Sequence, residues 1–204
     1  MLDYYRQHPQ YAVLIIVLLI ITLFVCYKAV KSSLDRAARN QKIINKLKEQ
    51  NRLANDFAIL TRELIESAAP EDLFGGVGIN LQRNIAAKTD MAGEFEKLND
   101  SQKYIYALYN MVDDAGEKVS DFFRMNTRPL TSTALSAVKI IAPGEFADVF
   151  SKEFDAFDDE NEEVSCIPEE IKKGDSIMSP YIQNGTLAEL CGKYIKDNVS
   201  NFII

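Results

Sequence analysis

The chain has 204 residues, a formal net charge of −7, three cysteines and one histidine. This length suffices for one membrane segment and one modest domain, since domains usually contain about 100–200 residues. Three cysteines are too few for a disulfide scaffold, so we expect a conventional hydrophobic core. The only histidine, His8, precedes a long apolar run. The domain that follows therefore has no Ser-His-Asp or Cys-His catalytic group and no histidine-ligated zinc ion.

The apolar run covers Tyr11–Tyr27 and contains no formally charged residue. Because about 20 helical residues cross a hydrocarbon core of about 30 Å, we predict a transmembrane helix over residues 11–30. Residues 1–10 then form a short extracytoplasmic N-terminus. A core helix of a soluble protein would seldom be apolar around its whole circumference. A cleaved signal peptide would have a shorter apolar region, of about 7–15 residues, followed by small residues at a cleavage site.

Basic residues follow the apolar run. Between Lys28 and Arg52 there are eight basic residues, opposed only by Asp35 and Glu49. Basic residues beside a membrane segment stay on the cytoplasmic side, so we predict a single-pass protein of the cell membrane with a cytoplasmic C-terminal domain. The basic side chains nearest the membrane are expected to contact anionic lipid headgroups. They are Lys28, Lys31, Arg36, Arg39 and Lys42.

Residues 31–69 contain no proline or glycine, which predicts that the transmembrane helix continues as a basic juxtamembrane helix. Apolar or small residues recur along it at spacings that resemble an interrupted coiled-coil seam. These residues are Ile43, Leu47, Ala54, Phe57, Leu64 and Ala68. The seam allows a homodimer through residues 43–68, but packing onto the protein's own domain from about Leu53 is the preferred interpretation.

A glycine-containing connection with short helices is predicted over residues 70–98. Pro70 opens it, and three glycines stand between Gly75 and Gly78. Gly76 and Gly78 resemble the start of a dinucleotide-binding fingerprint. Leu81 occupies the position of the third glycine, however, and no strand precedes the segment, so nucleotide binding is not expected.

Residues 99–204 are predicted to form an acidic helical domain. Apolar residues recur there at helical spacing and rarely alternate with period two, which predicts an all-α fold. Asn99 to Ser101 is a predicted N-cap region, Ser132 or Thr133 is expected to cap a later helix, and Gly174 is expected to end one. The helices are expected over residues 102–114, 119–125, 132–141, 145–157, 168–173 and 186–198, with a turn at 180–185.

The acidic charge is concentrated in this half of the chain. Residues 53–204 hold 27 acidic and 14 basic residues, a balance of −13, and seven carboxylates lie in Glu153–Glu163. The spacing of Phe146, Phe150, Phe154 and Phe157 predicts a helix that buries these rings and directs its carboxylates outward. The expected partner-binding residues are Asp155, Asp158, Asp159, Glu160, Glu162 and Glu163. Their spacing does not match a calcium-binding loop, so neither a metal nor a cofactor is predicted.

Four segments of residues 99–204 carry a family resemblance: residues 102–109, 121–126, 135–142 and 190–202. They read QKYIYALY, DFFRMN, LSAVKIIA and LCGKYIKDNVSNF. Together they resemble the small helical domain of the bacterial DNA-mimic-protein family. The family's Asn-Gly-Gly motif is absent, and only Gly116 corresponds to it. The resemblance implies a non-catalytic domain that presents an acidic surface to DNA-binding proteins.

Two functional hypotheses follow. The first is a membrane-anchored protein whose acidic, non-catalytic domain binds a partner protein. The alternative is a regulator that acts by DNA mimicry on a basic nucleic-acid-binding protein. An enzyme is not expected, because Cys166 and Cys191 lack a histidine partner and Cys191 lies on an apolar helix face. Direct binding of nucleic acid by the domain is disfavoured by its negative charge.

Overall fold

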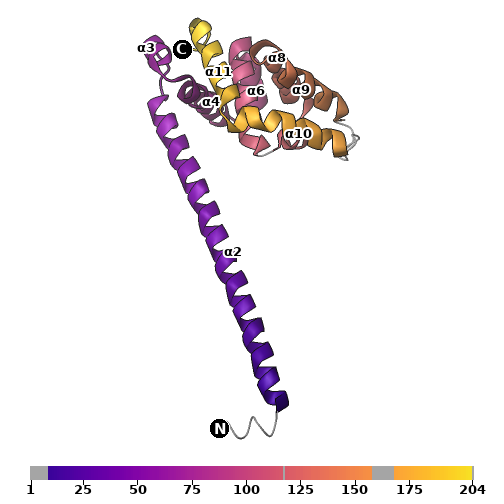
Figure 1. Ribbon diagram of the computed structural model, residues 1–204. Helices are drawn as coiled ribbons and strands as arrows, with labels where there is room; N and C mark the ends of the chain where they lie inside the picture. The colour runs from indigo at the N-terminus through magenta and orange to yellow at the C-terminus, as the bar shows by residue number, and fades with distance from the viewer. Residues whose placement is uncertain (1–8, 117, 158–167, 204) are drawn as a thin grey trace. The chain divides into compact units, whose positions relative to one another are not determined.

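The computed structural model describes residues 9–116, 118–157 and 168–203 (Figure 1). Over these residues the chain forms ten α-helices and one short 3-10 helix, with no strand. The predicted all-α class is therefore confirmed. The chain divides into two compact units between Glu49 and Gln50.

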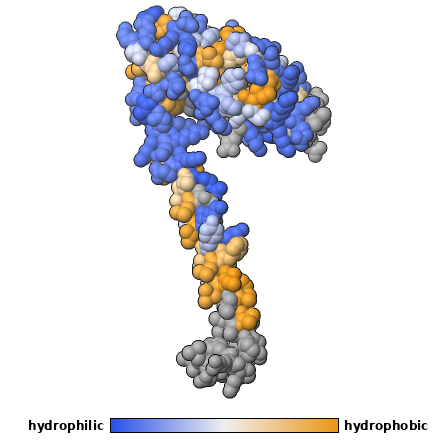
Figure 2. Space-filling view, in the orientation of Figure 1, coloured by the Kyte–Doolittle hydropathy of each residue, from blue (hydrophilic) through white to orange (hydrophobic). Residues whose placement is uncertain are grey.

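The described part of the first unit is one continuous stretch of helix α2 (Pro9–Asp56). Every apolar side chain for which exposure is given between Val17 and Val25 is 49% to 61% exposed. Figure 2 shows this part of α2 as strongly hydrophobic. Among the described residues, α2 is the one helix long and apolar enough to cross a membrane, and none of that apolar window is buried.

The second unit begins within the last turns of α2, at Gln50. Its further elements are α3 (Arg62–Ser67), α4 (Pro70–Ala86), α5 (Met91–Lys97), α6 (Asp100–Ala115), α7 (Val119–Met125), α8 (Arg128–Ile141), α9 (Glu145–Ala156), α10 (Pro168–Gln183), α11 (Thr186–Asp197) and η1 (Val199–Asn201). Helix α4 packs against α6 and α11, and α6 also contacts α7 and α8. Helix α9 contacts both α8 and α10 (Figure 1). One hydrophobic core joins all of these helices except α5.

The end of α2 and the segment after it contribute to this core. Leu53, Phe57 and Ile65 are 8%, 3% and 0% exposed. The C-terminal part of the predicted seam thus packs into the chain's own hydrophobic core, as expected from Leu53 onward. Ile43 and Leu47 are more than half exposed, at 58% and 53%, and a homodimer through residues 43–68 stays a prediction.

The expected flexible connection at Pro70–Gly78 is wrong, because these residues begin helix α4. Glycine inside a helix costs about 1 kcal/mol relative to alanine, which is why the sequence suggested a break. Here the glycines serve close packing. A Cβ atom on Gly76 would overlap the ring of Phe57, and one on Gly78 would overlap the ring of Tyr109. Packing against these rings compensates for the low helix propensity of the two glycines.

Three other predicted boundaries are corrected. The helix predicted over residues 31–69 ends at Asp56, and a separate helix, α3, covers Arg62–Ser67. Helix α8 begins at Arg128, and not at Ser132 or Thr133, because Pro129 in its first turn has the φ angle that a helix start requires. Helix α10 continues through Gly174 and Pro180 to Gln183. Burial of Ile171 and Met178 on this helix, at 5% and 0% exposure, outweighs the two helix-breaking residues. The predicted N-cap region of α6 is observed, with Asn99 and Gln102 forming a capping box.

The position of the core predicts where the folding unit begins. A chain that starts at Gln50 should fold without the preceding residues. A chain that starts at Pro70 loses Leu53, Phe57 and Ile65 from the core, and each such loss typically costs about 2–5 kcal/mol. Urea unfolding followed by circular dichroism should show a cooperative transition for the first chain and a much weaker or absent one for the second. Equal unfolding free energies would mean that these three side chains do not belong to the core.

Candidate functional site

Helices α9 and α10 enclose a groove of about 690 Å³. Small-molecule sites in proteins usually have volumes of about 300–1,000 Å³, so the groove has the size of a ligand site. Its walls are apolar in part and carry both acidic and basic side chains. The lining residues are Glu145, Asp148, Val149, Lys152, Glu153 and Ala156 from α9, and Glu170, Ile171, Lys173, Gly174 and Ile177 from α10.

Glu153 is the most unusual of these residues because it is only 4% exposed. Among the described residues, neither of its carboxylate oxygens has a hydrogen-bond partner. Burial, and to a smaller extent the negative charge of Asp175, raise the pKa of Glu153 to about 8 against the opposing effect of the positive charge of Arg124. At neutral pH this carboxyl group is therefore mostly protonated.

Gly174 provides the space for this carboxyl group. A Cβ atom at Gly174 would overlap Oε1 of Glu153. The absence of a side chain at this position thus lets α10 approach α9 while the carboxyl group lies between them. The glycine that the sequence marked as a helix end is instead a contact point in the middle of α10.

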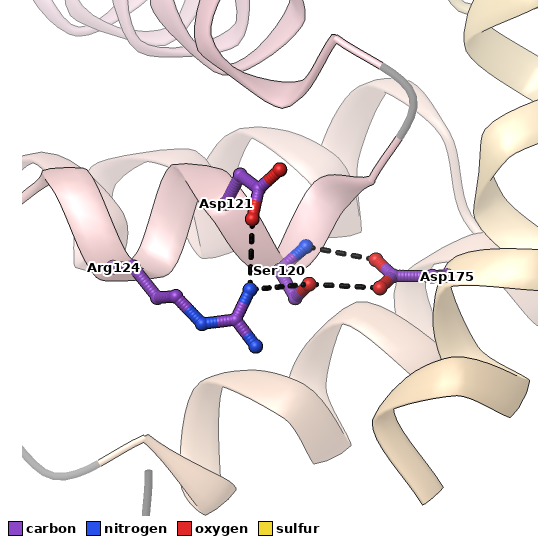
Figure 3. A network of polar contacts seen from close by, with 4 residues as sticks. All are labelled: Ser120, Asp121, Arg124 and Asp175. Carbon is purple, nitrogen blue, oxygen red and sulfur yellow. Dashed lines mark hydrogen bonds and ion pairs between the residues drawn. The ribbon is translucent and has the colours of Figure 1, made fainter. Parts of the chain in front are cut away.

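Asp175, the next residue on α10, connects this helix to α7 (Figure 3). Its two carboxylate oxygens accept hydrogen bonds from the backbone N–H and the hydroxyl of Ser120, at 2.9 and 2.8 Å. Ser120 is the second residue of α7, whose N-cap residue Lys118 makes no side-chain capping bond. Asp175 therefore caps α7 from another helix, where its negative charge also stabilises the positive end of the helix dipole.

Arg124 extends this network along α7. Its guanidinium group donates hydrogen bonds to Oγ of Ser120 at 3.1 Å and to Oδ1 of Asp121 at 2.8 Å (Figure 3). Ser120 is fully buried and Asp175 is 7% exposed, so the bonds between them are shielded from water. The result is a fixed polar connection between α7 and α10, beside the carboxyl group of Glu153.

The predicted aromatic stripe of α9 is partly wrong. Phe146, Phe150 and Phe157 are buried, as predicted, but Phe154 is only half-buried. The guanidinium group of Arg128 lies over the ring of Phe154, 4.2 Å from its centre. Glu153 takes the buried position instead, so the expectation that all carboxylates of this stretch face outward is wrong for this residue.

A signal for this arrangement was present in the sequence. Residues 146, 150, 153 and 157 are spaced by four, three and four, which keeps them on one helix face as well as the all-phenylalanine pattern does. Because phenylalanine is apolar and glutamate is charged, the prediction placed Phe154, and not Glu153, as the third buried residue of this helix face. Only the room left by Gly174 makes the glutamate fit there.

Of the residues predicted to bind a partner, the structure describes Asp155, which does not line the groove. Asp155 is exposed on α9. Asp158, Asp159, Glu160, Glu162 and Glu163 lie outside the described residues. The five residues predicted to contact the membrane surface are all exposed on α2, in the first unit: Lys28, Lys31, Arg36, Arg39 and Lys42.

The cysteines and possible metal ligands give no further site in the described part of the chain. Cys191 is fully buried, as its place on an apolar helix face predicts, and burial raises the pKa of its thiol. It therefore provides no thiolate nucleophile at neutral pH. Cys166 lies outside the described residues. Within the described ranges, no group of three or more His, Cys, Asp or Glu residues is arranged to hold a metal ion.

Comparisons of the chain with known protein families, with curated proteins and with solved structures find no match. The resemblance of residues 99–204 to the DNA-mimic-protein family stays a prediction. Functional conclusions therefore depend on the chemistry of the residues described above.

The raised pKa of Glu153 predicts how stability changes with pH. The folded chain keeps this proton up to about pH 8, whereas the unfolded chain releases it near the ordinary value of 4.5. Stability should thus fall as the pH rises between these values. The variant Glu153→Gln has no titrating group at this position, so it does not lose this stability. The difference between its unfolding free energy and that of the natural chain should therefore increase in favour of the variant by about 2–3 kcal/mol between pH 6 and pH 9.

Urea unfolding at the two pH values measures this difference. Asp155→Asn, an exposed substitution on the same helix, is the matched control and should change stability by less than about 0.5 kcal/mol at both. An equal effect of Glu153→Gln at pH 6 and pH 9 would show that the carboxyl group does not titrate in this range.

Proposed function

We propose that this chain is a single-pass membrane protein, anchored by α2, whose acidic helical domain lies in the cytoplasm and binds a partner protein without catalysis. The observation that carries the proposal is the exposure of the apolar side chains of α2. Side chains at 49% to 61% exposure over Val17–Val25 are costly in water and favourable in hydrocarbon. The helix is also continuous and long enough to span a bilayer.

The charges that follow the apolar stretch support the orientation. The basic side chains from Lys28 to Lys42 are exposed and free to meet anionic headgroups, at about 1 kcal/mol each near the surface. The domain beyond Leu53 carries −13 and is repelled by the same surface. Opposite charges on adjacent segments thus hold the helix in the membrane and keep the domain away from the lipid.

The acidic segment that begins at Asp155 is the proposed partner surface. Asp155 is exposed on the last turn of α9, and the five other carboxylates follow it in the sequence before α10 begins. Such a dense negative charge attracts a basic protein surface and accelerates its association. A homodimer through the exposed residues Ile43 and Leu47 is compatible with this role.

DNA mimicry is a second candidate for the role of the acidic surface. The excess of 27 acidic over 14 basic residues beyond Leu53 favours it, because carboxylates at phosphate-like positions can capture a DNA-binding protein. The resemblance of residues 99–204 to the DNA-mimic-protein family points the same way. Competition distinguishes the two candidates: duplex DNA should displace a partner bound by mimicry and leave any other partner in place.

The first test concerns orientation. Green fluorescent protein fused after Ile204 should fluoresce, and alkaline phosphatase fused there should be inactive, because the fusion stays in the cytoplasm. Replacing the five membrane-proximal basic residues by glutamine should produce a mixed population, since these charges set the orientation. Active alkaline phosphatase on the natural sequence would overturn the proposed topology.

The second test concerns the acidic surface. Replacing Asp155, Asp158, Asp159, Glu160, Glu162 and Glu163 by Asn or Gln should leave the fold intact, since surface substitutions usually change stability by less than about 0.5 kcal/mol. Partners identified by proximity labelling from the domain should bind the natural chain more weakly as salt is raised, and should bind this variant at least about tenfold more weakly at low salt.

A variant with six other neutralised carboxylates separates a local surface from net charge. These residues are Glu63, Glu66, Glu71, Glu96, Glu189 and Asp197. This second variant should keep most of the binding to the partner protein. Equal losses in both variants would mean that the partner senses only the overall charge.

Phe150→Ala, at a fully buried ring, should instead cost about 3–5 kcal/mol of stability.

A further inference from the structure

The buried carboxyl group of Glu153 belongs to the lining of a ligand-sized groove, and the described part of the chain gives it no hydrogen-bond partner. Among the described residues it has neither a hydrogen bond nor an ion pair, although it is only 4% exposed. The segment between α9 and α10, residues 158–167, contains five carboxylates and no basic residue, so it brings no positive charge either. Buried charged groups in proteins are normally paired.

We propose that the groove between α9 and α10 binds an ammonium group on a short alkyl stem, with Glu153 as its counterion. The rim favours a cation, because Glu145, Asp148 and Glu170 outnumber Lys152 and Lys173. A neutral hydrogen-bond acceptor would accept a bond from the protonated carboxyl group of Glu153 but would gain nothing from these three other acidic residues. An anion would be repelled by them.

The apolar part of the groove lining favours a ligand whose ammonium group is attached to an alkyl stem. Val149, Ala156, Ile171 and Ile177 line the groove around the carboxyl group. They offer an alkyl chain a surface that water leaves on binding, while the ammonium group meets Glu153. A bare inorganic cation would use the carboxylate but not these walls. The combination therefore fits an amphipathic amine.

Two kinds of ligand have an ammonium group on an alkyl stem: a free alkylamine and a lysine side chain of a protein. Asp155, the one residue of the proposed acidic partner surface that the structure describes, does not line the groove. The two proposals are tested by different substitutions, Glu153→Gln here and the six-carboxylate variant above, so the failure of one does not decide the other.

Binding should depend on pH, since the ammonium group pairs with the ionised carboxylate. The burial that raises the pKa of Glu153 to about 8 keeps the empty site mostly protonated at pH 6. The apparent affinity should then rise about tenfold per pH unit up to about pH 8 and level off above it. The charged groups around Glu153 are Asp175, Glu170 and Lys173 on α10, Arg124 on α7, and Glu145, Asp148 and Lys152 on α9.

The test uses the full chain in phospholipid nanodiscs and three probes: hexylammonium chloride, the uncharged hexanol, and an acetyl-Ala-Lys-Ala-amide peptide. Chemical shifts of the Val149 and Gly174 backbone amides report binding in the groove. Hexylammonium, the peptide or both should shift these signals, with an affinity that rises between pH 6 and pH 8. Comparison of the two affinities tells whether the groove prefers the free amine or the lysine side chain.

Glu153→Gln should weaken binding of the charged probe at least tenfold at pH 8 and remove its pH dependence. Glu63→Gln, which removes one exposed carboxylate on α3, is the matched control and should leave the affinity within about twofold. An unchanged circular dichroism spectrum shows that both variants fold. The inference is overturned if neither charged probe binds, if hexanol binds as tightly, or if Glu153→Gln has no greater effect than Glu63→Gln.

Discussion

The close approach of α4 to its neighbours is the constraint on which the second unit depends. Gly76 and Gly78 let the rings of Phe57 and Tyr109 lie directly on the backbone of α4. On the other side, Gly192 of α11 contacts the carbonyl group of Pro70, where a Cβ atom would overlap it. Since α6 then contacts α7 and α8, and α8 contacts α9, the position of the groove follows from these glycine contacts.

A second constraint acts at the groove itself, where two consecutive residues of α10 have different roles. Gly174 leaves room for the carboxyl group of Glu153, and Asp175 caps α7 through Ser120. The capping bond fixes α10 in rotation about its own axis. With that rotation fixed, the glycine faces α9 and the charge of Asp175 adds to the raised pKa of Glu153. The cap, the space and the pKa thus have one structural origin.

The sequence predicted the helical class and the long apolar N-terminal helix because both depend on local periodicity and composition. The closing helix from Thr186 was also predicted well, since its apolar residues recur at regular spacing. Gly76, Gly174 and Pro180 misled the prediction, because each usually ends a helix unless tertiary packing compensates. That packing involves Phe57 and Glu153, which are distant in sequence. Local patterns carry no information about such partners.

Of the candidate functional residues, Asp155 was predicted to be exposed and is exposed, whereas Glu153 was grouped with the outward-facing carboxylates. Both are acidic and lie two residues apart, so composition does not separate them. Helical geometry does, because two residues correspond to a rotation of about 200°, which places the two side chains on nearly opposite faces of α9. One of those faces contacts the core, and only a three-dimensional structure tells which acidic residue it carries.

The two acidic features of this domain therefore act by different physics. Exposed carboxylates are screened by salt over about 8–10 Å, so the proposed attraction of a basic partner would weaken as ionic strength rises. Glu153 is shielded from water, so salt would screen an ion pair there less than one at the surface. Its raised pKa predicts that the domain loses stability as the pH rises, and among the described residues its carboxyl group makes no hydrogen bond. A cost of that kind is expected where a side chain serves a ligand rather than the core. In the two proposals, the surface carboxylates would set how fast a basic partner arrives, and Glu153 would set how long an ammonium group stays in the groove.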